Sequence, residues 1–319
     1  GQYRRALIND RGHSLESNVE LSKLRQALEA RYLMPYHHPL NDTLTFVGGY
    51  ERETRLPNVD GTLDLLLQSL SVGVERALRP PQRGWERTWS LRYQLDQLDL
   101  GPLSASIDPT QLPPPFNIGY NIPRQQSLLL GYGLNRVRKQ GGIDPLQAWR
   151  QYYQLQVGSK ALLTDVDLVI AQAGLRRIYS FGTDWQHQLI GRLDGGMIWT
   201  KTFDAMPYNL RFFAGGDQSI RGYDYKSLSH LENGYQVGGQ NLAVGSVEYN
   251  YRFRPAWRAA VFADAGNAFD RQWRDPVKVG LGLGVRWSSP IGPVRLDVAA
   301  GVSETKVPIR LHFFIGPAL

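Results

Sequence analysis

A glycine-rich loop centred on Arg221-Gly222-Tyr223 contains the residues whose types and spacing most clearly suggest a function. It lies in an irregular segment of about 40 residues, from near position 201 to near 241, and such segments are usually either functional or disordered. Disordered segments are poor in aromatic residues. This one carries several: Phe212, Phe213, Tyr223, Tyr225 and Tyr235. We therefore expect it to be ordered against another part of the chain, with Arg221 available for bidentate pairing with a carboxylate.

The other residue types that could do chemistry form no recognisable catalytic group. The six histidines make no Ser/His/Asp cluster, and His37-His38 beside Pro39 indicates a turn rather than a metal site. We find no P-loop, dinucleotide-binding fingerprint or zinc spacing, and the absence of cysteine excludes disulfides and thiol chemistry. We expect a protein that is not an enzyme, with no catalytic residues, no cofactor and no metal.

The charge pattern gives no sign of a nucleic-acid partner. The formal net charge of +7 is spread along the chain rather than gathered in a basic stripe. We interpret these charges as polar residues of loops and of a water-filled interior, and we expect no binding of nucleic acid.

Strict alternation of apolar and polar residues predicts β-strands, most clearly towards the C-terminus. In 242–252, Glu248 shares a face with Ser246 and Asn250, and in 257–266, Asp264 shares a face with Phe262 and Gly266. Three further strands are predicted near 277–287, 293–298 and 310–316.

The N-terminal part alternates less regularly but in the same way. Its predicted strands lie near 3–8, 15–21, 28–32, 44–51, 64–78, 89–95, 127–138, 149–160, 166–180 and 182–199. Between them, the stretch 101–126 contains six prolines and is predicted to be a long surface loop, since proline is excluded from central strands.

About fifteen strands of about 8–14 residues are long enough to cross a bilayer when tilted. Single strands do not separate a soluble sandwich from a membrane barrel, but their number and the lack of helical pattern favour the barrel. We predict an all-β fold: a transmembrane antiparallel β-barrel domain over 1–319. Because single-chain bacterial barrels have even strand numbers, we expect sixteen strands in the intact protein, the first lying upstream of Gly1.

A wide polar lumen gives the irregular segment a place to fold, because irregular backbone at membrane depth is tolerated only in protein or beside a water-filled cavity. Alternation places Glu248 and Asp264 on the lumen side of adjacent strands, so Arg221 could pair with both. Gly215, Gly216 and Gly222 would allow tight turns and close approach to the wall. The alternative is that Arg221 lies in a solvated loop and that the two carboxylates are polar lumen residues without a specific partner.

The run Gly-Gly-Asp-Gln-Ser-Ile-Arg-Gly-Tyr at 215–223, followed by Val-Phe-Ala-Asp-Ala-Gly at 261–266, resembles the outer-membrane assembly superfamily that includes BamA, TamA and the two-partner secretion transporters. With Gly-Ser-Val-Glu-Tyr at 245–249 and the ending Ile-Gly-Pro-Ala-Leu at 315–319, it looks most like the TamA branch, the barrel subunit of the translocation and assembly module. The resemblance is strong over 205–319 and looser upstream.

The resemblance implies an outer-membrane location in a Gram-negative bacterium and a lumen loop whose arginine pairs with the acidic residue of a Phe-x-Asp-x-Gly strand. The matching residues are Arg221, Gly222 and Tyr223 with Phe262, Asp264 and Gly266, and Glu248 is a second acidic partner. It also implies periplasmic POTRA domains before the barrel, a TamB-like partner that reaches the inner membrane, and nascent outer-membrane β-barrel proteins as substrates.

The predicted working part is a lateral gate between the first and last strands. The last strand ends in glycine and proline, which weaken a ladder, and an exposed strand edge templates pairing with another chain. Its residues are Leu311, Phe313, Phe314, Ile315 and Gly316. The resemblance implies that outer-membrane proteins such as autotransporters are inserted or secreted through this gate. The alternatives are a passive porin-like channel and a lipid outlet working with a periplasmic partner.

Overall fold

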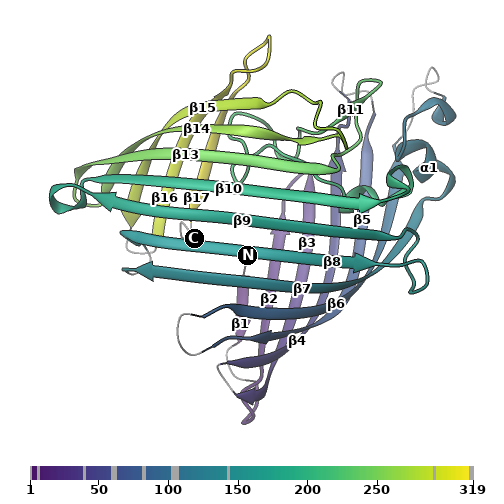
Figure 1. Cartoon of the computed structure of the whole chain (residues 1–319), viewed down its shortest axis with the longest axis horizontal. Helices are drawn as coiled ribbons and strands as arrows, with labels where there is room; N and C mark the ends of the chain where they lie inside the picture. Colours follow the sequence, from purple (N-terminus) through teal and green to yellow (C-terminus); the bar gives the residue numbers. More distant parts are fainter. Residues whose placement is uncertain are drawn as a thin grey trace.

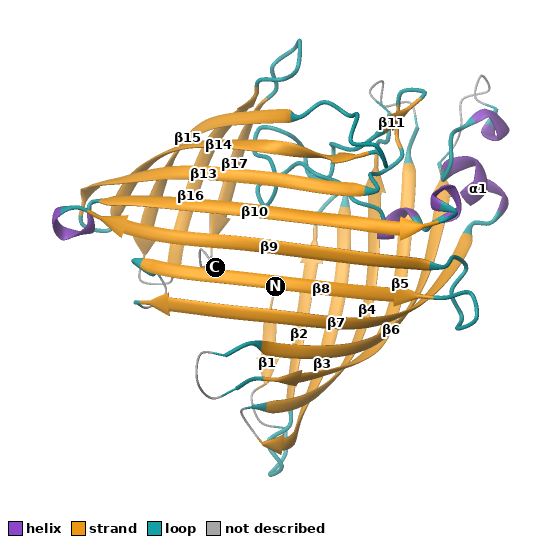
Figure 2. Ribbon diagram, in the orientation of Figure 1, coloured by secondary structure: helices purple, strands orange, loops and turns teal. Residues whose placement is uncertain are grey.

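The computed structural model describes residues 2–5, 8–38, 41–58, 63–80, 84–101, 108–141, 144–289 and 292–315. Fifteen strands form one antiparallel sheet in chain order, and the sheet curls into the wall of a barrel (Figures 1 and 2). They are β1 (Gln2–Arg5), β2 (Ser14–Leu21), β3 (Arg25–His38), β4 (Asp42–Arg55), β5 (Leu65–Leu78), β6 (Glu86–Leu100), β7 (Arg124–Gln140), β8 (Gln147–Gly158), β9 (Leu168–Phe181), β10 (His187–Thr200), β13 (Asn241–Arg254), β14 (Trp257–Phe269), β15 (Lys278–Ser289), β16 (Gly292–Gly301) and β17 (Ile309–Ile315). The predicted all-β antiparallel architecture is confirmed.

The two faces of the wall follow the period-two pattern of the sequence. Along β14, Trp257 and Val261 are exposed on the outer face, whereas Arg258, Phe262 and Asp264 are buried on the inner face. Exposed apolar side chains cover the outer face of the other strands in the same way. This is the pattern of a barrel that faces lipid outside and a polar lumen inside. Among the described residues no helix is long and apolar enough to cross a membrane.

The connections differ in length between the two ends of the barrel. The longest ones, 101–123 and 201–240, follow β6 and β10 and lie at the same end, whereas short turns such as 255–256 lie at the other. Outer-membrane barrels have longer extracellular loops and shorter periplasmic turns. The end that carries 201–240 therefore corresponds to the extracellular side.

The first and last strands of the sheet are both edges in the described part of the chain. β1 bonds only with β2 and β17 only with β16. With fifteen antiparallel strands in chain order, β1 and β17 run in the same direction. They cannot pair with each other as antiparallel neighbours.

The predicted irregular segment matches the connection between β10 and β13. It contains two 3-10 turns, η3 (Phe203–Ala205) and η4 (Tyr208–Leu210), and a small hairpin of β11 (Leu231–Glu232) with β12 (Tyr235–Gln236). Its side chains Met206, Phe212 and Ile220 are buried with residues of the surrounding wall, as expected for an ordered segment.

The proline-rich stretch is not the simple surface loop that its composition predicted. After η1 (Pro109–Gln111) it forms a short helix, α1 (Phe116–Asn121), and Phe116 has 0% of its surface exposed. Its ring lies 5.6 Å from that of Tyr208 and 6.0 Å from that of Tyr235. Proline density indicates a break in the sheet, but it contains no information on which long-range apolar partner the segment finds.

Replacing Phe116 with alanine should detach this helix from the long loop. Loss of a buried aromatic ring costs about 3–5 kcal/mol, so the 101–123 segment should become protease-sensitive while the strands stay resistant. Limited proteolysis with mass spectrometry measures this. Tyr120→Ala, at a 54% exposed position of the same helix, is the control and should change little. Equal cleavage of the Phe116 variant and the parent would contradict the packing role.

Candidate functional site

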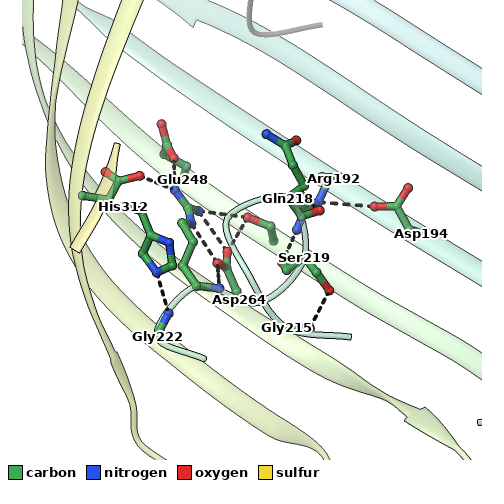
Figure 3. Close-up of polar contacts among 12 residues, drawn as sticks. Arg192, Asp194, Gly215, Gln218, Ser219, Gly222, Glu248, Asp264 and His312 are labelled. Carbon is green, nitrogen blue, oxygen red and sulfur yellow. Dashed lines mark hydrogen bonds and ion pairs between the residues drawn. The ribbon is translucent and has the colours of Figure 1, made fainter. Parts of the chain in front are cut away.

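The glycines of the loop permit the turns that bring Arg221 to the wall. Gly215, Gly216 and Gly222 all have positive φ, a region that side chains rarely adopt. A Cβ on Gly222 would lie 2.7 Å from the backbone carbon of Ala300, so only glycine allows this contact with β16. Figure 3 shows the loop against the inner face of the strands.

Arg221 reaches both carboxylates predicted for it. Its Nε donates to Asp264 Oδ2 at 2.8 Å and its Nη2 to Asp264 Oδ1 at 2.9 Å, and the backbone N–H donates to the same carboxylate at 3.0 Å. Its Nη1 donates to Glu248 Oε2 at 2.8 Å. Asp264 is 0% exposed, so these are bonds between desolvated charges.

Phe262 supports the guanidinium from one side. The Arg221 Cζ lies 3.4 Å from the centre of the Phe262 ring, a cation–π stack. On the neighbouring strand, a Cβ on Gly282 would come within 2.3 Å of the same ring. Gly266 has φ +150, and a Cβ there would lie 2.1 Å from the Ala243 oxygen. Phe262 and Asp264 thus contact Arg221, and Gly266 leaves room for the backbone of the neighbouring strand β13.

Three further wall residues complete the network, and the sequence analysis did not assign them to it. Arg286 donates to both Glu248 oxygens at 2.9 Å and to Asp297 Oδ1 at 2.5 Å. Asp297 Oδ2 also accepts from Arg221 Nη1 at 3.2 Å, and Ser246 donates to Asp264 Oδ1 at 2.6 Å. Alternation placed Ser246 on the same face as Glu248, but it identified no partner for Arg286 or Asp297. Their pairing depends on cross-strand register, which single-strand patterns do not give.

Tyr223 connects the loop to β15, and His312 connects it to β17. The Tyr223 hydroxyl donates to the Val279 oxygen at 3.3 Å. The Gly222 N–H donates to His312 Nε2 at 3.1 Å, and Arg310 forms an ion pair with Asp224 at 2.6 Å. The loop is therefore bonded directly to β17.

The predicted gate residues divide between the two faces of β17. Leu311, Phe313 and Ile315 are exposed on the outer face, with Leu311 at 69%. Phe314 faces inward, and the Arg295 Cζ lies 5.7 Å from its ring centre. Gly316 lies outside the described residues.

Arg211 holds the base of the loop together without any carboxylate. Its guanidinium donates to the backbone oxygens of Phe203, Asp204, Met206 and Val237 at 2.8–3.2 Å. Burial lowers the pKa of Arg211 to about 10. Backbone carbonyls thus hold this guanidinium in place but, unlike the carboxylates around Arg221, do not offset the cost of burying its charge.

One group of side chains has the composition of a metal site. His230, Asp270 and Asp275 place ligand atoms within 4.8 Å of one another. The His230 Nδ1 is 2.9 Å from Asp275 Oδ1, and Asp270 accepts hydrogen bonds from the backbone and side chain of Arg274. These hydrogen bonds between loops account for the cluster, so it gives no reason to change the prediction of no metal.

Comparison with protein-family models identifies the family of this chain. The model of the Omp85 superfamily domain matches residues 8–318. The chain belongs to the Omp85 superfamily.

Sequence relatives within this superfamily include the outer membrane protein assembly factor BamA of Nitratidesulfovibrio vulgaris, 36% identical over 126 residues. That match covers 37% of this chain and 16% of the relative. Outer envelope protein 80 of Arabidopsis thaliana chloroplasts is 32% identical over 116 residues, covering 33% of this chain and 14% of the relative. The matches thus span about one sixth or less of the relatives' length.

Solved structures share the fold of this Omp85 barrel. BamA of Haemophilus ducreyi lacking POTRA domains 1–3 has a TM-score of 0.77 at 17% identity, over 99% of this chain and 66% of that one. CdiB of Acinetobacter baumannii has a TM-score of 0.60 at 16% identity, over 96% of this chain and 51% of that one. At these identities the similarity is one of fold.

Arg221→Ala should destabilise the barrel strongly, because it leaves Asp264, Glu248 and Asp297 with one arginine between them. Removing one partner of a buried ion pair costs about 3–5 kcal/mol. Arg221→Lys keeps the charge but not the fork, so its loss should be intermediate. The urea midpoint for loss of the compact, heat-modifiable form measures both. Arg274→Ala, at a side chain 73% exposed, is the control and should cost about 0–1 kcal/mol. An unchanged midpoint in Arg221→Ala would contradict the network's role.

Gly280→Ala tests the contact between loop and wall without touching a charge. A Cβ at Gly280 would lie 1.9 Å from the Arg221 carbonyl oxygen, so the loop must move away and its 201–240 backbone should become open to trypsin. Gly191→Ala is the matched strand control, because a Cβ there meets nothing within 4 Å. Equal protection in both variants would show that the loop is not seated as described.

Proposed function

We propose that this Omp85 barrel assembles or secretes outer-membrane proteins through a lateral gate between its first and last strands. One observation carries the proposal: β17 has a free edge in the described part, and the lumen loop is bonded to this same strand. A free edge offers unpaired N–H and C=O groups to an incoming strand. The loop contacts give the barrel a means to hold or release that edge.

The bonds that hold β17 to the loop are few compared with those that hold Arg221. His312 accepts one hydrogen bond from Gly222, and the Arg310–Asp224 pair is exposed to water on both sides. Exposed ion pairs contribute about 0–1 kcal/mol. The loop therefore adds little to the free energy that holds β17 in place, most of which comes from its ladder with β16.

The names of the relatives support this class of function. One sequence relative is an outer membrane protein assembly factor, and the shared fold includes BamA. The proposal extends to the TamA-like role, on the resemblance of 205–319: a TamB-like partner, autotransporter substrates and a Gram-negative outer membrane. Copurification of such a partner with the full-length protein tests this part, and its failure leaves the gate itself standing.

The proposed role needs no chemical step, consistent with the prediction that the protein is not an enzyme. A passive porin gives no reason for a buried network that fixes a loop inside the lumen. Single-channel recording separates the two, since a porin would conduct steadily with the loop in place.

A photo-reactive residue at Leu311 should capture nascent outer-membrane proteins in cells that make the full-length protein. Position 311 is 69% exposed on the β17 edge, and Leu70, 54% exposed on β5, is the control in the middle of the wall. We expect substrate adducts, identified by mass spectrometry, from position 311 and few from position 70. Equal capture at both positions, or capture of lipid alone, would overturn the gate.

A further inference from the structure

Three arginines form a row across neighbouring strands on the lumen side of the wall. In the strand register Arg150 of β8 lies opposite Arg176 of β9, and Arg176 lies opposite Arg192 of β10. Like charges directly opposite each other destabilise a sheet. A barrel with no use for this row would gain stability by changing it.

The next row contains Asp194, a carboxylate close to these arginines. Tyr152 lies opposite Gly174, and Gly174 lies opposite Asp194. A Cβ on Gly174 would lie 2.2 Å from Tyr152, so the missing side chain lets the Tyr152 hydroxyl reach across and donate to Asp194 Oδ1 at 3.0 Å. The other Asp194 oxygen is 3.3 Å from Arg192. Asp194 is thus engaged with Tyr152 and Arg192.

Arg192 also donates hydrogen bonds to the loop, whereas the further contact of Arg150 is with the Tyr152 ring, whose centre lies 6.0 Å from the Arg150 Cζ. The Arg192 Nη1 donates to the Gln218 oxygen at 2.6 Å, and its Nη2 to the Ser219 oxygen, both at the tip of the lumen loop (Figure 3). In the described structure Arg150 and Arg176 have no ion pair, and their Nε atoms are buried with no hydrogen-bond partner.

Several other lumen arginines are paired with carboxylates. Arg31 and Arg92 share Glu75 at 2.7 and 3.0 Å, and Arg258 meets Asp144 at 2.6 Å. Arg150 and Arg176 therefore differ from these paired arginines.

The row lines a cavity of about 300 Å³ with Tyr152, Asp194 and Gln218. Three guanidinium groups against one carboxylate leave this cavity a net formal charge of +2. A phosphate monoester carries a charge of about −2 at neutral pH and several strong acceptor oxygens, and the arginine fork matches phosphate geometry. A single carboxylate would neutralise only half of the charge.

We propose that Arg150, Arg176 and Arg192 form a binding site for a phosphate-type oxyanion in the lumen, beside the tip of the loop. The phosphate is supplied either free or as the phosphomonoester headgroup of phosphatidic acid. The site does not depend on the gate, and it gives the loop tip, through Arg192, a contact with whatever anion enters.

Calorimetric titration of the purified full-length protein in neutral detergent with inorganic phosphate, at constant ionic strength, tests the site. We expect saturable binding at one site per chain, weakened by about 10-fold or more in Arg176→Gln and in Arg150→Gln, the loss of a charge-assisted hydrogen bond. Arg92→Gln, which removes a paired lumen arginine, is the matched control and should bind like the parent.

Two further measurements distinguish a specific phosphate site from general charge attraction and from a purely structural role of these arginines. Acetate at the same ionic strength should bind more weakly than phosphate. Without phosphate, the thermal midpoint of Arg176→Gln should be no lower than that of the parent, because like-charge repulsion is relieved. No saturable phosphate binding, equal binding of acetate, or equal loss in Arg92→Gln would each overturn the proposal, as would a lowered midpoint in Arg176→Gln.

Short-chain phosphatidic acid identifies the source of the phosphate. Tighter binding than inorganic phosphate, with the same loss in Arg176→Gln, supports a lipid headgroup, and equal binding with that same loss supports free phosphate. Binding of the lipid that is insensitive to Arg150 and Arg176 would count against the site.

Discussion

The charge of Arg221 is the constraint on which the arrangement of the lumen depends. Two arginines, Arg221 and Arg286, share three buried carboxylates, Glu248, Asp264 and Asp297, so loss of either cation leaves a large uncompensated negative charge. A buried ion pair is weak evidence for extra stability compared with an apolar core, but a broken one is costly. The network therefore selects one conformation of the 40-residue connection, because every other position of the loop would leave buried charges without partners. Packing favours the same conformation, because the Arg221 guanidinium stacks on the Phe262 ring and the loop approaches the wall closely where glycines leave room.

The same loop contacts strands that are far apart in the sequence. Its centre is bonded to β13, β14 and β16 through carboxylates, its flank touches β17 through His312, and its tip covers Arg192 of β10. A displacement of β17 is therefore felt at the loop, whose base is fixed independently by the carbonyls around Arg211. The loop is thus attached strongly at Arg211 and Arg221 and weakly at β17. This arrangement would let β17 move while the rest of the loop stays fixed.

Local patterns in the sequence predicted the faces of the strands and the ordered segment between 200 and 241. Alternation alone put Glu248 and Asp264 in the lumen, because side-chain direction in a strand has period two. The roles of Arg286, Asp297 and His312 could not be predicted in that way, since they depend on which residues of four different strands stand at one height. The burial of Phe116 was missed for a related reason: its partners Tyr208 and Tyr235 are about a hundred residues away in the chain, and no periodicity connects them.

Three successive inward positions of β15, between Lys278 and Arg286, are Gly280, Gly282 and Gly284. Each occupies the place where a different neighbour needs room: the Arg221 backbone, the Phe262 ring and the Asp297 carboxylate. Such a run is usually taken as a sign of a weak strand. Here the three glycines leave room for the loop and for the wall residues that bind Arg221. A barrel of this superfamily that lost the loop would no longer have a reason to keep glycine at these positions, so the three glycines and the Arg-Gly-Tyr motif should be gained and lost together in evolution.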